Sequence, residues 1–160
     1  MQKFQSHLQN SMKLRKGKNR ELDQVVALAK RTFNKSYRPF LGDHNIDWYI
    51  NSGEYKREIA KQFNDLYVLD IDGTIAGFII YFEDFIHLMM VDEEQHRGGL
   101  GTFMLNEVEK ELFKTYDSIT LQSFYGNKAA TSFYEKNGWK KGKVNNANEV
   151  VAMMYFTKTK

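Results

Sequence analysis

The feature that most constrains this fold is a glycine-rich stretch between an apolar run and an amphipathic helix pattern. Residues 85–91 are apolar except for His87, and the three glycines Gly98, Gly99 and Gly101 follow shortly after. Glycines let backbone N–H groups approach a ligand closely, and the N-terminus of a following helix favours an anion. By itself, the stretch indicates a phosphate-binding loop about as strongly as an ordinary strand-to-helix turn.

Apolar runs and turn residues predict the strands. Residues 66–71 and 74–82 are two such runs, and Asp72-Gly73 between them favours the positive φ angles of a tight hairpin turn. The nearly continuous apolar run at 85–91 is typical of a central strand that is buried on both faces. Further strands are predicted at residues 12–15, 118–123, 139–143 and 149–157.

Helical spacing of apolar residues predicts helices at residues 21–34, 54–63, 100–114 and 127–136. Residues 37–51, which include Pro39, are predicted to be irregular apart from a short helix near 46–50. The strand, loop, helix and strand between 85 and 123 form a crossover unit, so its two strands should be parallel. The element order therefore predicts a mixed α/β layer architecture with an antiparallel first half.

The length of 160 residues fits one domain at 12–160, and residues 1–11, which show no apolar period, are expected to form a flexible extension. No apolar run approaches the roughly 18 residues of a membrane span. The N-terminal segment is polar and basic and lacks the apolar centre of a signal peptide, so we expect a cytoplasmic protein without a membrane partner. A formal charge of +3 is too small to indicate nucleic-acid binding.

The absence of cysteine removes disulfides, thiolate metal sites and thiol nucleophiles from consideration. The histidines are His7, His44, His87 and His96, and they are not spaced as paired metal ligands, so no metal site is predicted. No Gly-Lys-Ser/Thr follows the glycine-rich loop, which excludes a Walker-type nucleotide site. Catalysis must therefore use other groups.

Residues 89–101 (MMVDEEQHRGGLG) and residues 127–139 (NKAATSFYEKNGW) are two stretches that together resemble the GNAT superfamily of N-acetyltransferases. Residues 89–101 are similar to the family's acetyl-CoA loop, with Gly99 and Gly101 as its glycines and His96 where the family has Gln or Arg. Residues 127–139 match the family's Asn-x-x-Ala-x-x-Phe-Tyr-x-x-x-Gly-aromatic signature throughout. The resemblance covers nearly the whole chain. It implies a mostly antiparallel sheet of six to seven strands, with helices on both faces and a central parallel strand pair that splays apart.

The resemblance also implies that acetyl-CoA is the co-substrate and lies where strands 85–91 and 118–123 splay. Its pantetheine arm would pair with the backbone of the first strand, and its pyrophosphate would bind at the glycine-rich loop. Carried over position by position, the contacts with acetyl-CoA fall on Met89, Met90, Val91, Arg97, Gly98, Gly99, Leu100, Gly101, Thr102 and Asn127. Tyr134 would lie beside the sulfur.

Tyr134 is the predicted general acid. Transfer of an acetyl group from a thioester to an amine needs a proton for the departing thiolate. A phenol of reference pKa about 10 can donate to a thiolate whose conjugate acid has a pKa near 8.5. The competing interpretation is that the Tyr134 ring only packs in the core, which would be the better one without the family motif.

His87 is the predicted base, since it is the sole ionisable side chain in an apolar strand. The resemblance supports this role, because many family members carry Glu at this position. A structural histidine, hydrogen-bonded in the core, is the alternative. Glu83 and Asp84 are the fallback bases, or they attract a cationic amine. Together with the carboxylates at 92–94, they are equally well explained as a solvated acidic rim.

The sequence thus predicts an acetyl-CoA-dependent N-acetyltransferase that works by direct transfer to a small-molecule or peptide amine. A non-catalytic acyl-CoA-binding module and a protein-interaction domain are the alternatives. Residues 37–51 and 144–148 are expected to set the acceptor specificity. The aromatic residues of the first segment either line that acceptor pocket or, as the default, pack in the core. A homodimer is left open.

Overall fold

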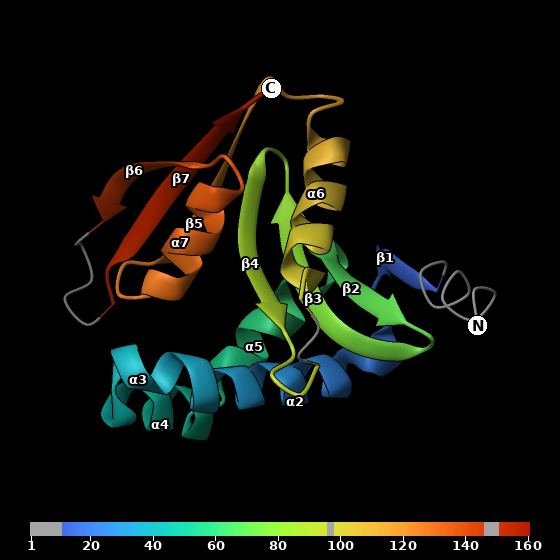
Figure 1. The fold of residues 1–160 in the computed structure, drawn as a ribbon. Coiled ribbons are helices and arrows are strands. Elements are labelled where there is room, and N and C mark those ends of the chain that lie inside the picture. Colours follow the sequence, from blue (N-terminus) through green and yellow to red (C-terminus); the bar gives the residue numbers. More distant parts are fainter. Residues whose placement is uncertain (1–10, 96–97, 146–150) are drawn as a thin grey trace.

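The computed structural model describes residues 11–95, 98–145 and 151–160. This part of the chain forms one seven-stranded sheet in the order β1-β2-β3-β4-β5-β7-β6 (Figure 1). The strands are β1 (Met12–Lys16), β2 (Leu66–Ile71), β3 (Thr74–Phe82), β4 (Phe85–Val91), β5 (Ser118–Phe124), β6 (Lys140–Asn145) and β7 (Met153–Thr159). All neighbouring strands are antiparallel except β4 and β5, which are parallel. The predicted mostly antiparallel sheet and its central parallel pair are therefore confirmed.

The turn between β2 and β3 has the predicted hairpin conformation. Asp72 and Gly73 have φ angles of 53° and 85°, both in the left-handed region that such a turn needs. The Gly73 N–H also donates to Asp70 Oδ1 at 2.7 Å, which closes the turn. β2, β3 and β4 have the predicted bounds, whereas β6 and β7 begin later than predicted. Residues 149–150 of the last predicted strand lie outside the described residues.

The helices are α2 (Leu22–Thr32), α3 (Arg38–Leu41), α4 (Asp43–Asn51), α5 (Glu54–Lys61), α6 (Leu100–Leu112) and α7 (Lys128–Lys136), with a π turn, η2 (Phe33–Tyr37), between α2 and α3. The prediction that residues 37–51 are mainly irregular was wrong, because α3 and α4 occupy most of the segment. Pro39 does not prevent this, since it lies in the first turn of α3, where a missing N–H breaks no helical hydrogen bond.

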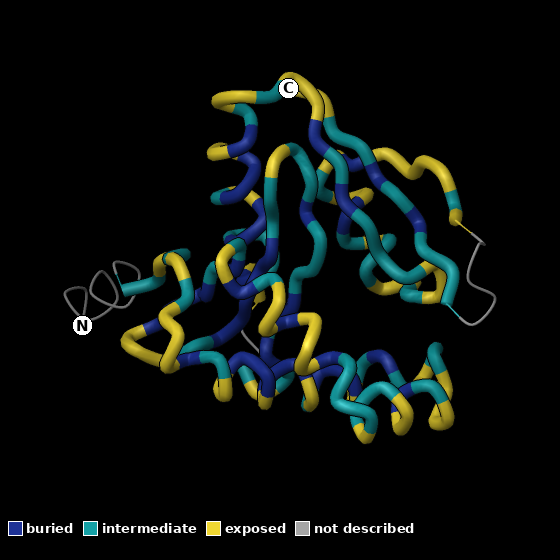
Figure 2. The backbone as a smooth tube through the Cα atoms, turned by 180° about the vertical axis from the view of Figure 1, so that it is seen from behind, coloured by how far each residue is buried: buried dark blue, intermediate teal, exposed yellow. Residues whose placement is uncertain are grey.

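The helices cover both faces of the sheet. A hydrophobic core lies on each face of the sheet, and alternating residues of β3 point into one or the other. Phe78 and Ile80 pack with α2, α4 and α5, while Ile79 packs with α6 and α7. Buried positions follow the central strands and the inward sides of the helices, whereas β6 at the sheet edge is mostly exposed (Figure 2). Within the described residues, every helix is too short or too polar to cross a membrane.

Candidate active site between β4 and β5

The site begins where the two parallel strands separate. β4 and β5 are paired at their start, where Phe85 and Ile86 lie beside Thr120 and Leu121, and beyond this point they diverge (Figure 1). The register between β3 and β4 shifts at His87, which is the extra residue of a β-bulge. A bulge bends its strand and re-aims a side chain. The bulge thus accounts both for the opening beside β5 and for the position of His87 at its edge.

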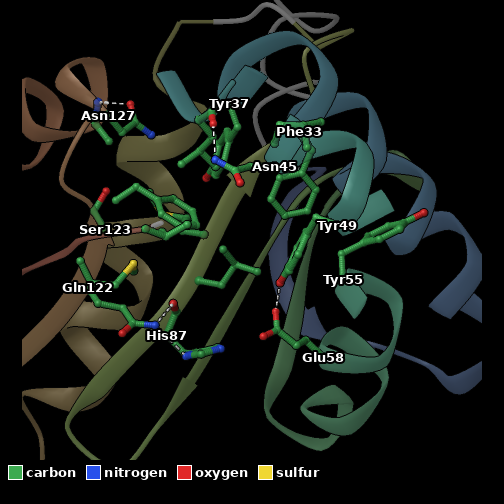
Figure 3. A pocket seen from close by; sticks show the side chains of 18 of the residues that line it. Phe33, Tyr37, Asn45, Tyr49, Tyr55, Glu58, His87, Gln122, Ser123 and Asn127 are labelled. Carbon is green, nitrogen blue, oxygen red and sulfur yellow. Dashed lines mark hydrogen bonds between the residues drawn. The ribbon is translucent and has the colours of Figure 1, made fainter. Parts of the chain in front are cut away.

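A cavity of about 900 Å³ fills this opening (Figure 3). One side is formed by the diverging strands and α7, through His87, Leu88, Met89, Gln122, Ser123, Phe124, Asn127, Ala130, Phe133 and Tyr134. The other side is formed by the helices at residues 33–59, including Phe33, Tyr37, Trp48, Tyr49, Tyr55 and Glu58. The predicted aromatic segment therefore does line a cavity, although several of its rings are also part of the core.

The edge of β4 that faces this opening offers unpaired backbone groups. The Asp92 N–H donates to Ala76 O, on the β3 side, at 2.8 Å. Because backbone groups alternate along a strand, those of Val91 and Met89 point the other way, toward β5. Those of Met90 point toward β3, so only Met89 and Val91 of the three predicted β4 contacts face the opening.

The glycine-rich loop ends in the N-terminus of α6. Gly99 has a φ of 90°, which favours glycine, and it caps the helix. The first hydrogen bond across this end runs from the Phe103 N–H to Gly99 O, at 2.9 Å. The preceding N–H groups of residues 100–102 have no acceptor within the helix. Gly98 and Gly99 are exposed, so this end of α6 can receive an anion.

Gly101 connects this helix end with the cavity. A Cβ atom on Gly101 would lie 3.2 Å from Phe133 Cζ, and Phe133 lines the cavity. The missing side chain at this position therefore lets α6 approach α7 closely. The sequence assigned this glycine to ligand contact alone, and the packing role was missed.

Tyr134, on α7, lines the cavity and is also part of the core. Its ring packs against Trp139 and Phe156, with centroid distances of 6.4 and 5.4 Å, and only 6% of the residue is exposed. Burial raises the pKa of its phenol above the usual value. The hydroxyl has no hydrogen-bond partner among the described residues. Tyr134 is thus both a core residue and a protonated donor at the cavity.

His87 is held in one tautomer by Gln122. Gln122 Nε2 lies 3.3 Å from the His87 carbonyl oxygen and 3.1 Å from His87 Nδ1 (Figure 3). The carbonyl can only accept, so the atom beside it must be the amide nitrogen. The same NH₂ group then donates to Nδ1, and the ring proton lies on Nε2. Burial lowers the pKa of His87, which also favours this neutral form.

Asn127 caps α7 and lines the cavity as well. Its side-chain oxygen accepts a hydrogen bond from the Ala130 N–H at 3.1 Å (Figure 3). This is the usual role of Asn immediately before a helix. The amide nitrogen of the same side chain is left to donate into the cavity.

Other predicted site residues lie elsewhere. Glu83 is in the β3–β4 turn, at a φ of 54°, where it is exposed and does not line the cavity. The structure therefore does not bring Glu83 to the site. His96 and Arg97 lie outside the described residues, so the Arg97 contact stays a prediction. The described residues contain no group of three or more His, Cys, Asp or Glu side chains that could hold a metal ion.

Two of the three carboxylates at 92–94 are held by residues of α2 and η2, whereas the Glu94 side chain is 70% exposed. Asp92 is 5% exposed, and its Oδ2 accepts from Arg31 Nη2 at 2.8 Å. The Ser36 hydroxyl donates to Glu93, and burial together with the Glu93 charge raises the pKa of Tyr37 to about 12. The start of the glycine-rich loop is thus attached to α2 and η2. Sequence reasoning missed this contact because its partners are far apart in the chain.

The comparisons with known proteins agree with this geometry. Residues 22–139 match the model of the acetyltransferase (GNAT) family. PaiA N-acetyltransferase from Thermoplasma acidophilum, solved in complex with coenzyme A, has a TM-score of 0.74 and 21% identity, over 94% of this chain and 99% of that chain.

Two further solved structures are similar over nearly the same length. A GCN5-related N-acetyltransferase from Rhodopseudomonas palustris has a TM-score of 0.79 and 15% identity, over 94% of this chain and 96% of that one. A GNAT-family acetyltransferase from Bacillus cereus has a TM-score of 0.68 and 16% identity, over 93% and 97%. At these identities the likeness concerns the fold alone.

Proposed function

Because this chain belongs to the GNAT acetyltransferase family, we propose that it moves an acetyl group from acetyl-CoA to a primary amine by direct transfer in a ternary complex. The observation that carries the proposal is the separation of β4 from β5 above a cavity that also contains Tyr134. A cleft of this kind can admit two substrates from its two sides.

The residues around the opening fit acetyl-CoA. The β4 edge at Met89 and Val91 offers backbone groups to the amides of a pantetheine arm, and Asn127, at the start of α7, offers a side-chain N–H from the cavity lining. The N-terminus of α6 offers N–H groups and a partial positive charge to the pyrophosphate. Acetyl-CoA supplies the activated acetyl group, and these residues orient it.

Tyr134 is the proposed proton donor. In the reaction, the nitrogen of a neutral amine bonds to the acetyl carbon, the carbon–sulfur bond breaks, and a proton reaches the departing sulfur. The raised pKa of Tyr134 keeps the phenol protonated throughout the physiological pH range. Its hydroxyl therefore remains a hydrogen-bond donor at every pH at which the enzyme would work.

The loss of the amine proton is assigned to water rather than to His87 or Glu83. For His87 to act as the base, its Nδ1 atom would have to give up the hydrogen bond from Gln122. Glu83 lies in the β3–β4 turn, away from the cavity lining. We therefore assign His87 a neutral role, in which Nε2–H is a donor at the cavity wall.

Calorimetry with acetyl-CoA tests the placement of the co-substrate. Ala130 lines the cavity, whereas its neighbour Ala129 is exposed on α7 and does not. Ala130→Phe should weaken acetyl-CoA binding at least about 10-fold, because the new ring occupies cavity volume. Ala129→Phe is the matched control and should bind as the wild type does. Equal affinities of both variants would refute the placement, provided that their thermal unfolding shows that both are folded.

A further inference from the structure

The acceptor side of the cavity is a preassembled aromatic wall. Phe33 makes edge-to-face contacts with Tyr37, Tyr49 and Tyr55, at centroid distances of 5.1, 5.2 and 5.9 Å. These rings come from η2, α4 and α5 and pack in one core, so they hold one another in place. Trp48, which is 58% exposed, stands at the rim of the same wall. Phe33, Tyr37 and Tyr55 are at most 8% exposed, so they form a fixed backing, and an apolar group in the cavity would contact mainly Tyr49 and Trp48.

Among the described residues of this lining, Glu58 is the one carboxylate. It comes from α5, and the Tyr49 hydroxyl donates to its Oε2 atom (Figure 3). No lysine or arginine of the described residues forms an ion pair with it. The partner of Glu58 is therefore a neutral phenol, which orients the carboxylate without cancelling its charge. The charge reaches across the cavity, since it acts to raise the pKa of His87, although burial lowers that pKa more strongly.

The lining also shows which substrates do not fit. No lysine or arginine lines the cavity among the described residues, so a substrate carboxylate or phosphate would lose its water and gain only neutral hydrogen-bond donors, with no cation to offset its charge. A polyamine or an amino-sugar antibiotic carries several positive charges, and the described lining offers them a single carboxylate. The neighbouring carboxylates Asp92 and Glu93 are already bonded to Arg31 and Ser36.

From this wall and the single carboxylate of the described lining, we propose that the acceptor is an amine with one positive charge, no anionic group and a flat apolar body, and that Glu58 binds its ammonium group before that nitrogen gives up a proton to water and attacks the acetyl carbon. This inference rests on the proposed acetyl transfer. The carboxylate gives a charge-assisted hydrogen bond, and the surrounding tyrosines favour a cation over their ring faces. The aromatic wall receives the apolar body. Glu58 is thus a specificity-determining residue, distinct from the proton donor Tyr134.

A panel of amines tests the proposed class. The rate of thiol release from saturating acetyl-CoA is measured with 2-phenylethylamine, phenylalanine and spermidine. Phenylalanine has the same ring and amine as the first compound and adds only a carboxylate, so it isolates the effect of an anionic group. We expect kcat/KM to be highest for 2-phenylethylamine and at least about 10-fold lower for phenylalanine and for spermidine.

A variant that removes the charge of Glu58 tests its role in binding the amine. In Glu58→Gln the side chain can still accept from the Tyr49 hydroxyl, so only the charge is lost. We expect KM for 2-phenylethylamine to rise about 10-fold or more, with kcat changed by less than about twofold. Glu54→Gln is the matched control, because Glu54 lies on the same helix, pairs with Arg57 at 2.8 Å and does not line the cavity. Its KM should stay at the wild-type value.

The outcomes separate this inference from the proposed function. Thiol release that is fastest with spermidine or phenylalanine would overturn the substrate class and leave acetyl transfer standing. An unchanged KM in Glu58→Gln would overturn the role of Glu58. No thiol release with any amine, despite acetyl-CoA binding, would overturn the proposed function itself and the inference with it.

Discussion

Glu21 should stabilise the fold in a strongly pH-dependent way. Arg15 of β1 donates two hydrogen bonds to the Glu21 carboxylate, at 2.9 and 2.7 Å, and a third to Asp70 at 2.8 Å. The side chain of Glu21 is 11% exposed, and the Arg15 hydrogen bonds hold its pKa down, from 4.5 to about 2. A shift of this size corresponds to about 3 kcal/mol of the free energy of unfolding.

The sign of the effect follows from the lowered pKa. A carboxylate whose pKa falls on folding contributes its full stabilisation above the unfolded pKa and loses it as the pH falls toward the folded one. The contribution of Glu21 should therefore be complete at pH 7, begin to fall near pH 4.5, and drop to less than half by pH 3. Glu21→Gln should accordingly lower the free energy of unfolding by about 3 kcal/mol at pH 7, and by much less at pH 3.

Urea denaturation of the wild type and of Glu21→Gln at pH 7, 5 and 3 measures this difference. Glu107→Gln is the control, since Glu107 pairs with Lys110 on the exposed surface of α6. This substitution should change the free energy of unfolding by less than about 1 kcal/mol. The reasoning is refuted if Glu21→Gln matches the wild type at pH 7. It is also refuted if the deficit is as large at pH 3 as at pH 7.

Three further predictions concern the site. Tyr134→Phe should lower kcat about 100-fold and leave the affinity for acetyl-CoA, measured by calorimetry, unchanged. Because the pKa of Tyr134 is raised, the pH profile of the wild-type rate should show no alkaline limb from Tyr134 below pH 10. An unchanged kcat in Tyr134→Phe would remove Tyr134 as the proton donor. Asn127→Ala should lower the free energy of unfolding, measured in urea, by about 1 kcal/mol because the helix cap is lost, whereas Asn127→Ser should keep the cap. Both variants should bind acetyl-CoA more weakly than the wild type. Wild-type affinity in both would limit the role of Asn127 to capping α7. His87→Ala should keep the low-pH limb of the kcat/KM profile, since the amine itself protonates there; loss of that limb would identify His87 as the base.

Much of the fold could be predicted because its signals are local. The Asp72-Gly73 turn needs only its own two positive φ angles, and the flanking runs at 66–71 and 74–82 have the predicted bounds. The parallel pairing of β4 and β5 followed from the strand–helix–strand order of a single crossover unit. Each of these features is decided within a short stretch of chain.

The details of the site could not be predicted because they depend on distant contacts. The tautomer of His87 is set by Gln122, which lies on another strand, and the burial of Asp92 depends on Arg31 of α2. The β-bulge at His87 is a matter of register, which the apolar pattern of the strand does not show. Glu58 belongs to no sequence motif, and only its position beside Tyr49 in the cavity indicates a role in binding the acceptor amine.

Thiol release from acetyl-CoA in the presence of a primary amine is the most direct test of acetyl transfer by this chain. The purified protein with acetyl-CoA and 2-phenylethylamine should release free CoA and form one equivalent of the N-acetylated amine, as measured by mass spectrometry. A non-catalytic acyl-CoA-binding module would bind acetyl-CoA without doing either. Binding of acetyl-CoA with no acetylated product from any amine of the panel would contradict the account.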